Sequence, residues 1–289
     1  MCYTVFKDLK DEATYSMKQE YISEITTDEI IYSHARFSIE DERRFGPHYH
    51  EKCEMIYIIA GDVHYIVEGK AYKLKKGDVV LSRPRQIHSI LPADGTVYER
   101  YIMLIDPKNI PHGVWDALKI GADVYHCEEG EIIEGILERL DLYFGKFAPE
   151  DYEILAKNAA TEIFSNLSLK EADVTTEKRN PTLSRALDYI RENLTEIKDI
   201  DEICSALYIT KSYLHHLFNQ HLKITPAKYI TTKRLIFARR RILKGARPTE
   251  IYQSAGFCDY ATFYRNYKRH FGYSPTQEGK TESAEEIRA

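Results

Sequence analysis

The last third of the chain repeats one helical pattern, and this repeat limits the possible folds more than any other feature. Apolar residues at helical spacing predict a short helix, a turn of about three residues and a second helix, and the pattern returns 48 or 49 residues later. The matching positions are Ile203 and Ile251, Leu207 and Ala255, Leu214 and Phe263, and Phe218 and Tyr267. Two helices joined by so short a turn form a helix-turn-helix, so the sequence predicts two such units in tandem.

Polar residues and a proline mark where these helices begin. We expect Asp199 or Asp201 to cap the first helix and Thr210 the second, because such side chains accept hydrogen bonds from the free N–H groups of a first turn. Pro248 suits the first turn of the third helix, since its missing N–H has no partner there anyway. Asp259 is expected to cap the fourth helix.

Between the two units, residues 226–244 predict one longer helix with an apolar side. At about 1.5 Å per residue this helix is a rod of about 28 Å. Two recognition helices enter successive major grooves on one face of DNA when they lie about 34 Å apart. A rod near this length is therefore suited to hold two DNA-reading units on one long, asymmetric site.

Charge is distributed unevenly along the chain, whose formal net charge is −5. Residues 1–180 carry −11, residues 181–280 carry +8 and residues 281–289 carry −2, and the stretch 211–270 alone reaches +11. A basic segment on an acidic protein is typical of a nucleic-acid-binding module, because phosphates attract it. The alternative is a solvated charged face without a ligand.

Composition excludes several classes of protein. The 289 residues are 43% hydrophobic and 29% charged, which indicates a globular chain long enough for two domains rather than a disordered or collagen-like one. No run of about 18 apolar residues predicts a transmembrane helix, and the N-terminus lacks the apolar run of a signal peptide. The five cysteines are scattered and never form C-x-x-C, so we expect no disulfides, no zinc finger and a cytoplasmic location.

The N-terminal part predicts a different architecture. Within residues 30–105, short apolar runs alternate with glycine-containing turns, a pattern typical of an antiparallel sandwich or barrel. Residues 131–169 predict two helices, divided at Pro149. The expected division of the chain is residues 1–169, a polar linker at 170–181, residues 182–280 and an acidic tail at 281–289.

Residues 183–276 resemble the DNA-binding domain of AraC/XylS-type transcription regulators. The resemblance rests on the run from Ile251 to Pro275, which ends in Phe-Gly-x-Ser-Pro, and on Thr225-Pro226-Ala227-Lys228-Tyr229-Ile230 followed by Arg234-Leu235 and Ala238-Arg239. The sequence departs from the family pattern at Tyr208, where the first turn usually has glycine, at Tyr252, and at Gln277-Glu278, which replaces Tyr-Arg.

This resemblance implies which side chains contact DNA. Base-edge contacts fall on exposed N-terminal positions of the second and fourth helices, namely Ser212, His215, His216, Tyr260, Ala261, Thr262, Tyr264 and Arg265. Hydroxyl, imidazole and guanidinium groups are suited to this role, and an arginine can donate a fork to guanine. Contacts to phosphates, which position the protein without reading sequence, are assigned to Lys211, Arg239, Lys268 and Arg269.

Residues 48–61 and 77–88 resemble the two cupin motifs, which also occur in the sensor domain of AraC-type regulators. His48, His50 and Glu54 have the same parity along an extended chain, so they can point into one interior. In metal-binding cupins these positions and that of His88 are the ligands, and three histidines with one carboxylate suit Fe, Mn, Ni or Zn. The alternatives are that these side chains line an effector pocket without a metal, or that they only support the core.

These observations predict an α+β protein of two domains. The first is an antiparallel β-barrel of cupin or jelly-roll type with two trailing helices, and the second is all-α with two helix-turn-helix units. The resemblance implies a cytoplasmic transcription regulator that binds promoter or operator DNA and senses a small molecule, with a carbohydrate as one class. It also implies a homodimer, through the apolar stripe Ile132, Ile133, Ile136, Leu137 and Leu140, and RNA polymerase as a partner if the protein activates.

We expect no catalytic residue, no required cofactor and no membrane partner, although a divalent metal fits the histidine set. The stripe in residues 131–169 has a second interpretation, which is simple packing on the outside of the barrel. The competing function is a metal-dependent cupin enzyme with an appended DNA-binding domain, because the set His48, His50, Glu54 and His88 is complete.

Overall fold

The computed structural model describes residues 19–38, 46–93, 95–170 and 180–278. The chain divides into two compact units, residues 1–178 and 179–289. The expected acidic tail at 281–289 lies outside the described residues, as does most of the expected linker. Along the helices that are described, none combines the length and the apolarity needed to cross a bilayer.

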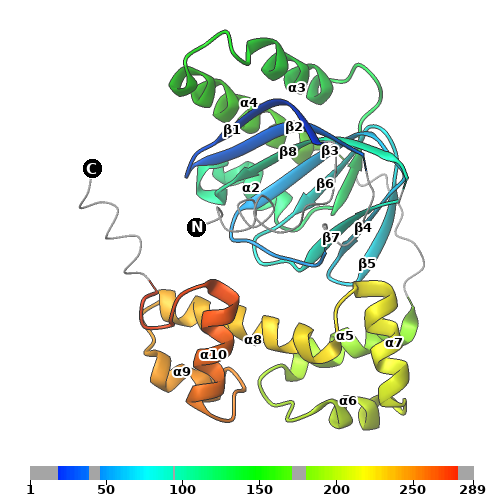
Figure 1. Ribbon diagram of the computed structural model, residues 1–289, viewed down its shortest axis with the longest axis vertical. Coiled ribbons are helices and arrows are strands. Elements are labelled where there is room, and N and C mark those ends of the chain that lie inside the picture. Colours follow the sequence, from blue (N-terminus) through cyan, green and yellow to red (C-terminus); the bar gives the residue numbers. More distant parts are fainter. Residues whose placement is uncertain (1–18, 39–45, 94, 171–179, 279–289) are drawn as a thin grey trace. The chain divides into compact units, whose positions relative to one another are not determined.

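The first unit contains two antiparallel sheets (Figure 1). Its strands are β1 (Gln19–Thr26), β2 (Ile30–Ser38), β3 (Cys53–Ala60), β4 (Val63–Val67), β5 (Lys70–Leu74), β6 (Asp78–Ser82), β7 (His88–Pro92), β8 (Val97–Ile105) and β9 (Val124–His126). One sheet has the order β1-β2-β8-β3-β6-β9 and the other the order β5-β4-β7. The antiparallel architecture is confirmed, but among these strands the pairing gives two separate sheets rather than a closed barrel.

Strand alternation gives this unit two hydrophobic cores. Along β8, Tyr98 and Ile102 belong to the core between the two sheets, whereas Tyr101 and Met103 belong to the core on the opposite face of the larger sheet. Successive side chains of a strand point to opposite faces, so the parity of a residue decides which core it enters. Cys53 has odd parity on β3 and lies in the second of these cores, away from the interior between the sheets.

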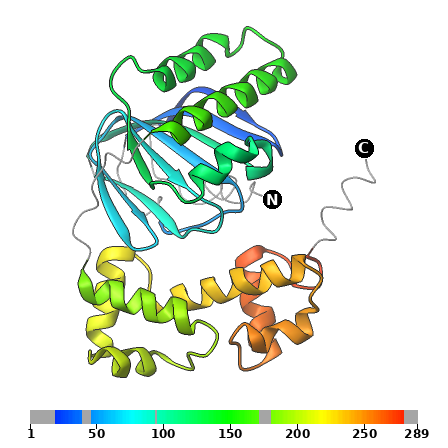
Figure 2. The ribbon, with the colours of Figure 1, turned by 180° about the vertical axis from the view of Figure 1, so that it is seen from behind.

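Helices cover the outer face of the larger sheet (Figure 2). The helical elements of this unit are the 3-10 turn η2 (Pro107–Asn109), α2 (His112–Leu118), α3 (Ile132–Tyr143) and α4 (Pro149–Leu169). The two helices expected within residues 131–169 are confirmed as α3 and α4. Of the apolar stripe of α3, Ile133, Ile136, Leu137 and Leu140 are buried in this core and Ile132 is 60% exposed. Packing on the sheet therefore uses most of the stripe.

Four elements lie outside the ranges that the sequence predicted. β1 precedes residue 30, and η2, α2 and β9 fall between residues 105 and 131. β9 has only three residues and α2 only seven. Periodicity is a weak signal over so few residues, and β1, although longer, is defined by its pairing with β2.

The second unit is all helical, with a first group of helices, a long connecting helix and a second group (Figure 1). Its helices are α5 (Pro181–Asn193), α6 (Ile200–Leu207), α7 (Lys211–Leu222), α8 (Pro226–Leu243), α9 (Pro248–Ser254) and α10 (Tyr260–Phe271). The predicted connecting helix is confirmed and ends one residue early. Of the two candidate caps for α6, the side chain of Asp199 accepts the hydrogen bonds, from the N–H groups of Asp201 and Glu202.

Candidate nucleic-acid interface and effector site

The first helix-turn-helix is formed by α6 and α7. Thr210 caps α7, because its Oγ1 accepts a hydrogen bond 3.1 Å long from the N–H of Tyr213. Between the helices Tyr208 has a left-handed backbone, with φ of 56°, and its side chain is 93% exposed. A conformation that favours glycine is thus imposed on a tyrosine, and the turn keeps the geometry that the family pattern implies.

The second helix-turn-helix is formed by α9 and α10. Gly256 has φ of +85° in the turn, and Asp259 caps α10 by accepting a 2.7 Å hydrogen bond from the N–H of Thr262. Phe263 and Tyr267 are fully buried and join α10 to α8 and α9 in one core. The two recognition helices, α7 and α10, lie near opposite ends of α8 (Figure 2), whose 18 residues span about 27 Å.

The side chains expected to read bases lie on these two recognition helices. On α7, Ser212 and His216 are exposed and His215 is half-buried. On α10, Ala261 and Arg265 are exposed, whereas Tyr260, Thr262 and Tyr264 are partly buried.

Two of these α10 side chains contact one another. The Nη2 of Arg265 donates a 3.2 Å hydrogen bond to Oγ1 of Thr262, so the threonine helps to orient the guanidinium. Each helix therefore carries a cluster of polar groups that can form hydrogen bonds with base edges.

The cationic side chains expected to contact phosphates differ in their exposure and in their ion pairs. Lys268 and Arg269 are exposed on α10, and Lys211 is exposed but forms an ion pair of 2.7 Å with Asp201. Arg239 instead turns back onto its own unit, where Nε lies 3.2 Å from Oε1 of Glu278 and the guanidinium stacks on a phenylalanine ring. The structure therefore gives Arg239 a packing role that the sequence did not suggest.

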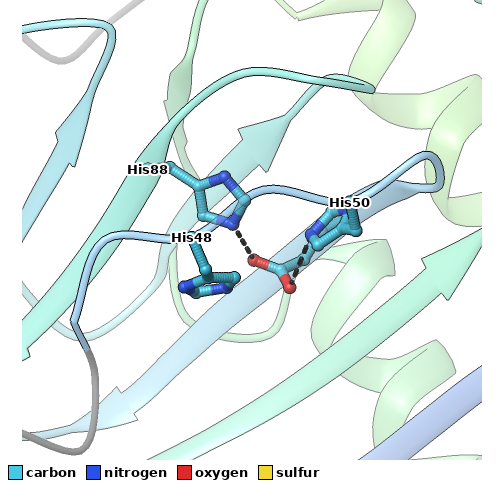
Figure 3. A group of neighbouring side chains, drawn as sticks. His48, His50 and His88 are labelled. Atoms are coloured by element: carbon cyan, nitrogen blue, oxygen red, sulfur yellow. Dashed lines mark hydrogen bonds and ion pairs between the residues drawn. The ribbon is translucent and has the colours of Figure 1, made fainter. Parts of the chain in front are cut away.

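The first unit brings the predicted histidine set together. Ligand atoms from His48, His50, Glu54 and His88 all lie within 4.8 Å of one another (Figure 3). Glu54 is on β3 and His88 begins β7, whereas His48 and His50 precede β3 and approach β7 through a backbone bridge between His48 and His88. The carboxylate is central, since Oε2 lies 3.2 Å from Nε2 of His50 and Oε1 lies 3.3 Å from Nε2 of His88.

Backbone carbonyls fix the orientation of all three imidazoles. Nδ1 of His48 donates to the carbonyl of Gly46, Nδ1 of His50 to that of Lys52 and Nδ1 of His88 to that of Gln86, over 2.8 to 2.9 Å. This leaves Nε2 of each ring for the interior. In His88 the buried Nε2 makes no hydrogen bond of good geometry with any residue in the described ranges, despite its 3.3 Å approach to the carboxylate.

The protonation states follow from burial and from the shared carboxylate. Burial opposes ionisation of Glu54, but the hydrogen bond from His50 and the close, charged contacts with His50 and His88 outweigh it and hold the pKa of this carboxyl well below its usual range. Burial, helped by the charge of His88, lowers the pKa of His48 to about 4. Near neutral pH the interior therefore offers an ionised carboxylate and an uncharged His48.

This arrangement has the chemistry of a metal-binding set. An ion bound at about 2.0–2.2 Å from each ligand needs donor atoms only a few ångströms apart, and these donors satisfy that requirement after small side-chain movements. The carbonyl at each Nδ1 is the kind of outer partner that orients a ligating histidine. The same groups can equally form hydrogen bonds with an organic ligand.

Two family models match the chain. The model of the AraC-like ligand binding domain matches residues 33–119, and that of a helix-turn-helix domain matches residues 203–280. The chain belongs to the AraC family of regulators. The first match covers the histidine set of this AraC-family chain, and the second covers both recognition helices.

Curated relatives of this AraC-family chain are transcription regulators. The XylDLEGF operon transcriptional activator of Pseudomonas putida is 27% identical over 154 residues, which are 52% of this chain and 44% of that activator. The raffinose operon transcriptional regulatory protein RafR of Pediococcus pentosaceus is 32% identical over 113 residues, which are 38% of this chain and 41% of that protein. The chain spans less than half the length of these relatives.

Two of the solved structures that match this chain are ToxT and CuxR. ToxT from Vibrio cholerae O395 matches 91% of this chain and 96% of its own, at 13% identity and a TM-score of 0.36. The AraC-like transcriptional activator CuxR matches 84% of this chain and 89% of its own, at 11% identity and a TM-score of 0.40.

Sequence reasoning gave no role to two arginines that the structure makes prominent. Arg100 is buried between the sheets of the first unit. It has the same parity along β8 as Tyr98 and Ile102, so the sequence could have indicated that it faces the same core. Arg234 on α8 donates hydrogen bonds to the backbone carbonyls of Leu194 and Ile197, between α5 and α6. No periodicity marks Arg234, because its partners are about 40 residues away.

Proposed function

We propose that this chain is a sequence-specific DNA-binding transcription regulator of the cytoplasm whose first unit binds a small-molecule effector. The observation that carries the proposal is the pair of capped helix-turn-helix units near the two ends of α8 (Pro226–Leu243), on the segment 211–270 whose net charge is +11. Phosphate attraction supplies affinity, and side chains at the starts of α7 and α10 read bases. Promoter or operator DNA is the partner.

A DNA selection tests this function. The full chain is incubated with random duplexes, and the enriched site is used in titrations at about 50 and 200 mM salt. A protein that contacts several phosphates loses about a thousandfold or more in affinity over this range, because counterions released on binding must compete with bulk salt. No enrichment, or an affinity unchanged between the two salt concentrations, would contradict the proposal.

The effector acts through its preference for one state of the protein. A ligand changes DNA binding only if its affinity differs between the DNA-bound and free arrangements. A carbohydrate is one proposed class, since relatives include regulators named for the raffinose operon and the lactose operon. Titrating the selected DNA with and without a panel of sugars tests this part of the proposal.

We also propose the histidine set as a site for a divalent metal. Its support is the convergence of the four side chains within 4.8 Å and the unbonded Nε2 of His88. The test is metal analysis of chain purified without a histidine tag, beside the variant Glu54→Gln as control. About one equivalent in the wild type alone supports the site, and less than about a tenth of an equivalent contradicts it.

The competing function, a metal-dependent cupin enzyme, has no support among the relatives, which are regulators. Bound metal would instead be a structural or effector-binding group. In such a site His48, His50, His88 and Glu54 hold the ion, which supplies an open position for an oxygen ligand.

A homodimer is proposed from the surface of the α3–α4 hairpin. Five large apolar side chains there are between 42% and 60% exposed, namely Ile132, Leu142, Phe144, Phe147 and Ile154. Exposed apolar side chains of this size on one helical hairpin favour a protein partner over solvent. Sedimentation of the wild type and of the variant Leu142→Glu tests it, since a dimer through this surface should become monomeric in the variant. RNA polymerase is the further partner if the protein activates.

A further inference from the structure

Arg100 places a positive charge inside the first unit. It lies on β8, is 5% exposed, and has the parity of Tyr98 and Ile102, which belong to the core between the sheets. Its neighbours on the adjacent strands are Ala35 on β2 and Ile58 on β3. The guanidinium therefore enters the interior that also contains the histidine set.

The guanidinium has little to compensate its burial. It donates a hydrogen bond of 3.1 Å to Oγ of Ser33, its Cζ lies 5.2 Å from the centre of the Phe37 ring, and it interacts with the hydroxyl of Tyr98. Within the ranges that the structure describes, no carboxylate oxygen lies within 4.0 Å of it. An arginine has five N–H donors, and a buried charge without a counter-ion is unfavourable. The surroundings are thus suited to receive an anion.

Arg83 shows what a structural arginine looks like in this same unit. Its side chain is also almost completely buried, but Nη1 lies 2.6 Å from Oδ1 of Asp123. Its remaining N–H groups donate to the backbone carbonyls of Leu118, Gly121 and Ala122 over 2.6 to 2.7 Å. Arg83 is neutralised by Asp123 and donates four hydrogen bonds, whereas Arg100 has no carboxylate partner among the residues that the structure describes.

Local backbone geometry also marks the position. The pairing of β3 with β8 shifts register between Ile58 and Ala60, next to Arg100, and such bulges re-aim side chains at binding sites. Glu54 is four residues along β3 from Ile58, or about 13 Å. Glu54 is already paired with His50 and His88, so it is not a counter-ion of Arg100.

We propose that Arg100 binds the carboxylate group of the effector, so that the ligand of this unit is a small organic acid rather than a neutral molecule. A guanidinium forms two parallel hydrogen bonds with a carboxylate, which gives both affinity and orientation. The hydroxyl groups of Ser33 and Tyr98 both interact with the guanidinium, and the body of the acid extends toward the histidine set. The inference rests on the proposed role of the first unit as an effector-binding domain.

The first test needs no knowledge of the ligand. We compare thermal unfolding of the full chain with that of Arg100→Met and Arg83→Met. If Arg100 is kept for binding, its replacement by an apolar side chain of similar length leaves the melting temperature unchanged or raises it by about 2–4 °C. Arg83→Met lowers it, because the buried Asp123 keeps Lys70 and Tyr72 but loses its closest cation, and three backbone carbonyls lose their donor. A large fall in the melting temperature of Arg100→Met would overturn the proposal.

The second test uses matched pairs that differ in the carboxylate: glucuronate and glucose, galacturonate and galactose, benzoate and benzamide. We expect at least one acid to stabilise the wild type and to bind at least about tenfold more tightly than its neutral partner, a preference lost in Arg100→Met and partly kept in Arg100→Lys. No stabilisation by any acid, or an equal response of Arg100→Met, would overturn the proposal. DNA binding is measured separately on the same proteins, so a failure of the regulator function is distinguished from a failure of this site.

Discussion

Arg234 on α8 and Gly256 in the second turn are so close that a β-carbon at residue 256 would lie 2.6 Å from Nε of Arg234. The same β-carbon would lie 2.9 Å from the carbonyl oxygen of Thr195, which belongs to the loop between α5 and α6. Arg234 donates hydrogen bonds to two other carbonyls of this loop. The first group of helices, the connecting helix and the second turn therefore meet in one contact, which fixes the relative orientation of the two helix-turn-helix units.

Alanine at Gly256 should disturb this contact, and Gly272 offers a matched control. Both glycines have positive φ, of 85° and 82°, but no atom of the described part of the chain lies within 4 Å of a β-carbon at Gly272. Gly272→Ala should lower the free energy of unfolding by about 1 kcal/mol through backbone strain alone. Gly256→Ala should lower it by about 1–3 kcal/mol more, because Arg234 must move. Urea unfolding followed by circular dichroism measures both.

The two glycine variants should also differ in DNA binding. Gly256→Ala is expected to weaken binding to the full selected site more than binding to either half of it, because only the full site requires a fixed orientation of the two readers. Gly272→Ala should weaken both equally or not at all. Equal losses on full and half sites for Gly256→Ala would show that the contact supports folding but not orientation.

Arg265 and Lys268 on α10 should have different effects on DNA recognition. Arg265→Ala is expected to lose about 1–3 kcal/mol and to relax the preference for one base pair, because a guanidinium reads a base edge. Lys268→Ala should weaken binding uniformly across sequences and reduce the salt dependence by about one phosphate contact. Binding to a set of single-base variants of the site, at several salt concentrations, separates these outcomes. A uniform loss for Arg265→Ala would contradict its assignment.

Tyr208 should be more stable as glycine. Its φ of 56° is unfavourable for a side chain with a β-carbon, by about 1–2 kcal/mol, and its ring is 93% exposed and so contributes little packing. Part of the gain is offset by the larger entropy of glycine in the unfolded chain. We expect Tyr208→Gly to raise the free energy of unfolding by up to about 1 kcal/mol. A decrease would mean that the tyrosine makes a stabilising contact.

Asp141 on α3 should contribute to acid sensitivity. It accepts hydrogen bonds from Nδ1 of His34 over 2.8 Å and from the hydroxyl of Tyr101 over 2.7 Å, which join α3 to the sheet. Burial opposes its ionisation, but the hydrogen bonds from His34, Ser23 and Tyr101 outweigh it and lower the pKa of the carboxyl. The folded state thus binds this proton less readily than the unfolded state, so stability falls as the pH drops below about 4.

Asp141→Asn should remove this dependence. At pH 7 we expect the free energy of unfolding to fall by about 1–3 kcal/mol, because partners of the carboxylate are left incompletely bonded. Between pH 5 and pH 3 the variant should lose less stability than the wild type does. The exposed Asp151 on α4 is the control, and Asp151→Asn should follow the wild-type curve. If Asp141→Asn loses as much stability between pH 5 and pH 3 as the wild type does, other groups control the acid sensitivity.

Much of the second unit could be predicted from the sequence because its signals are local. Thr210 and Asp259 cap the helices they were expected to cap, and Pro226 and Pro248 occupy first turns. Periodicity and caps depend on residues only a few positions apart, so both can be recognised without knowledge of the tertiary fold. The packing of Arg239 on Glu278 was missed because it joins residues 39 apart.

The first unit was less accessible to sequence reasoning. The histidine set was identified as a motif, and the structure brings its four members together. Parity alone does not account for this, because His48 and His50 lie before β3 and are placed by bridging to β7. β1 and β9 are edge strands, and only their pairing with β2 and β6 defines them. Such pairing is long-range and leaves little trace in a short stretch of sequence.

The most direct test of the account is hydroxyl-radical footprinting of the full chain on its selected DNA site. We predict two protected segments about one helical turn apart on one face of the duplex, because α7 and α10 lie near opposite ends of α8, whose 18 residues span about 27 Å. Arg265→Ala should remove protection of one segment, and the double variant Ser212→Ala, His216→Ala should remove protection of the other. A single protected segment, insensitive to changes on one of the two helices, would contradict the account.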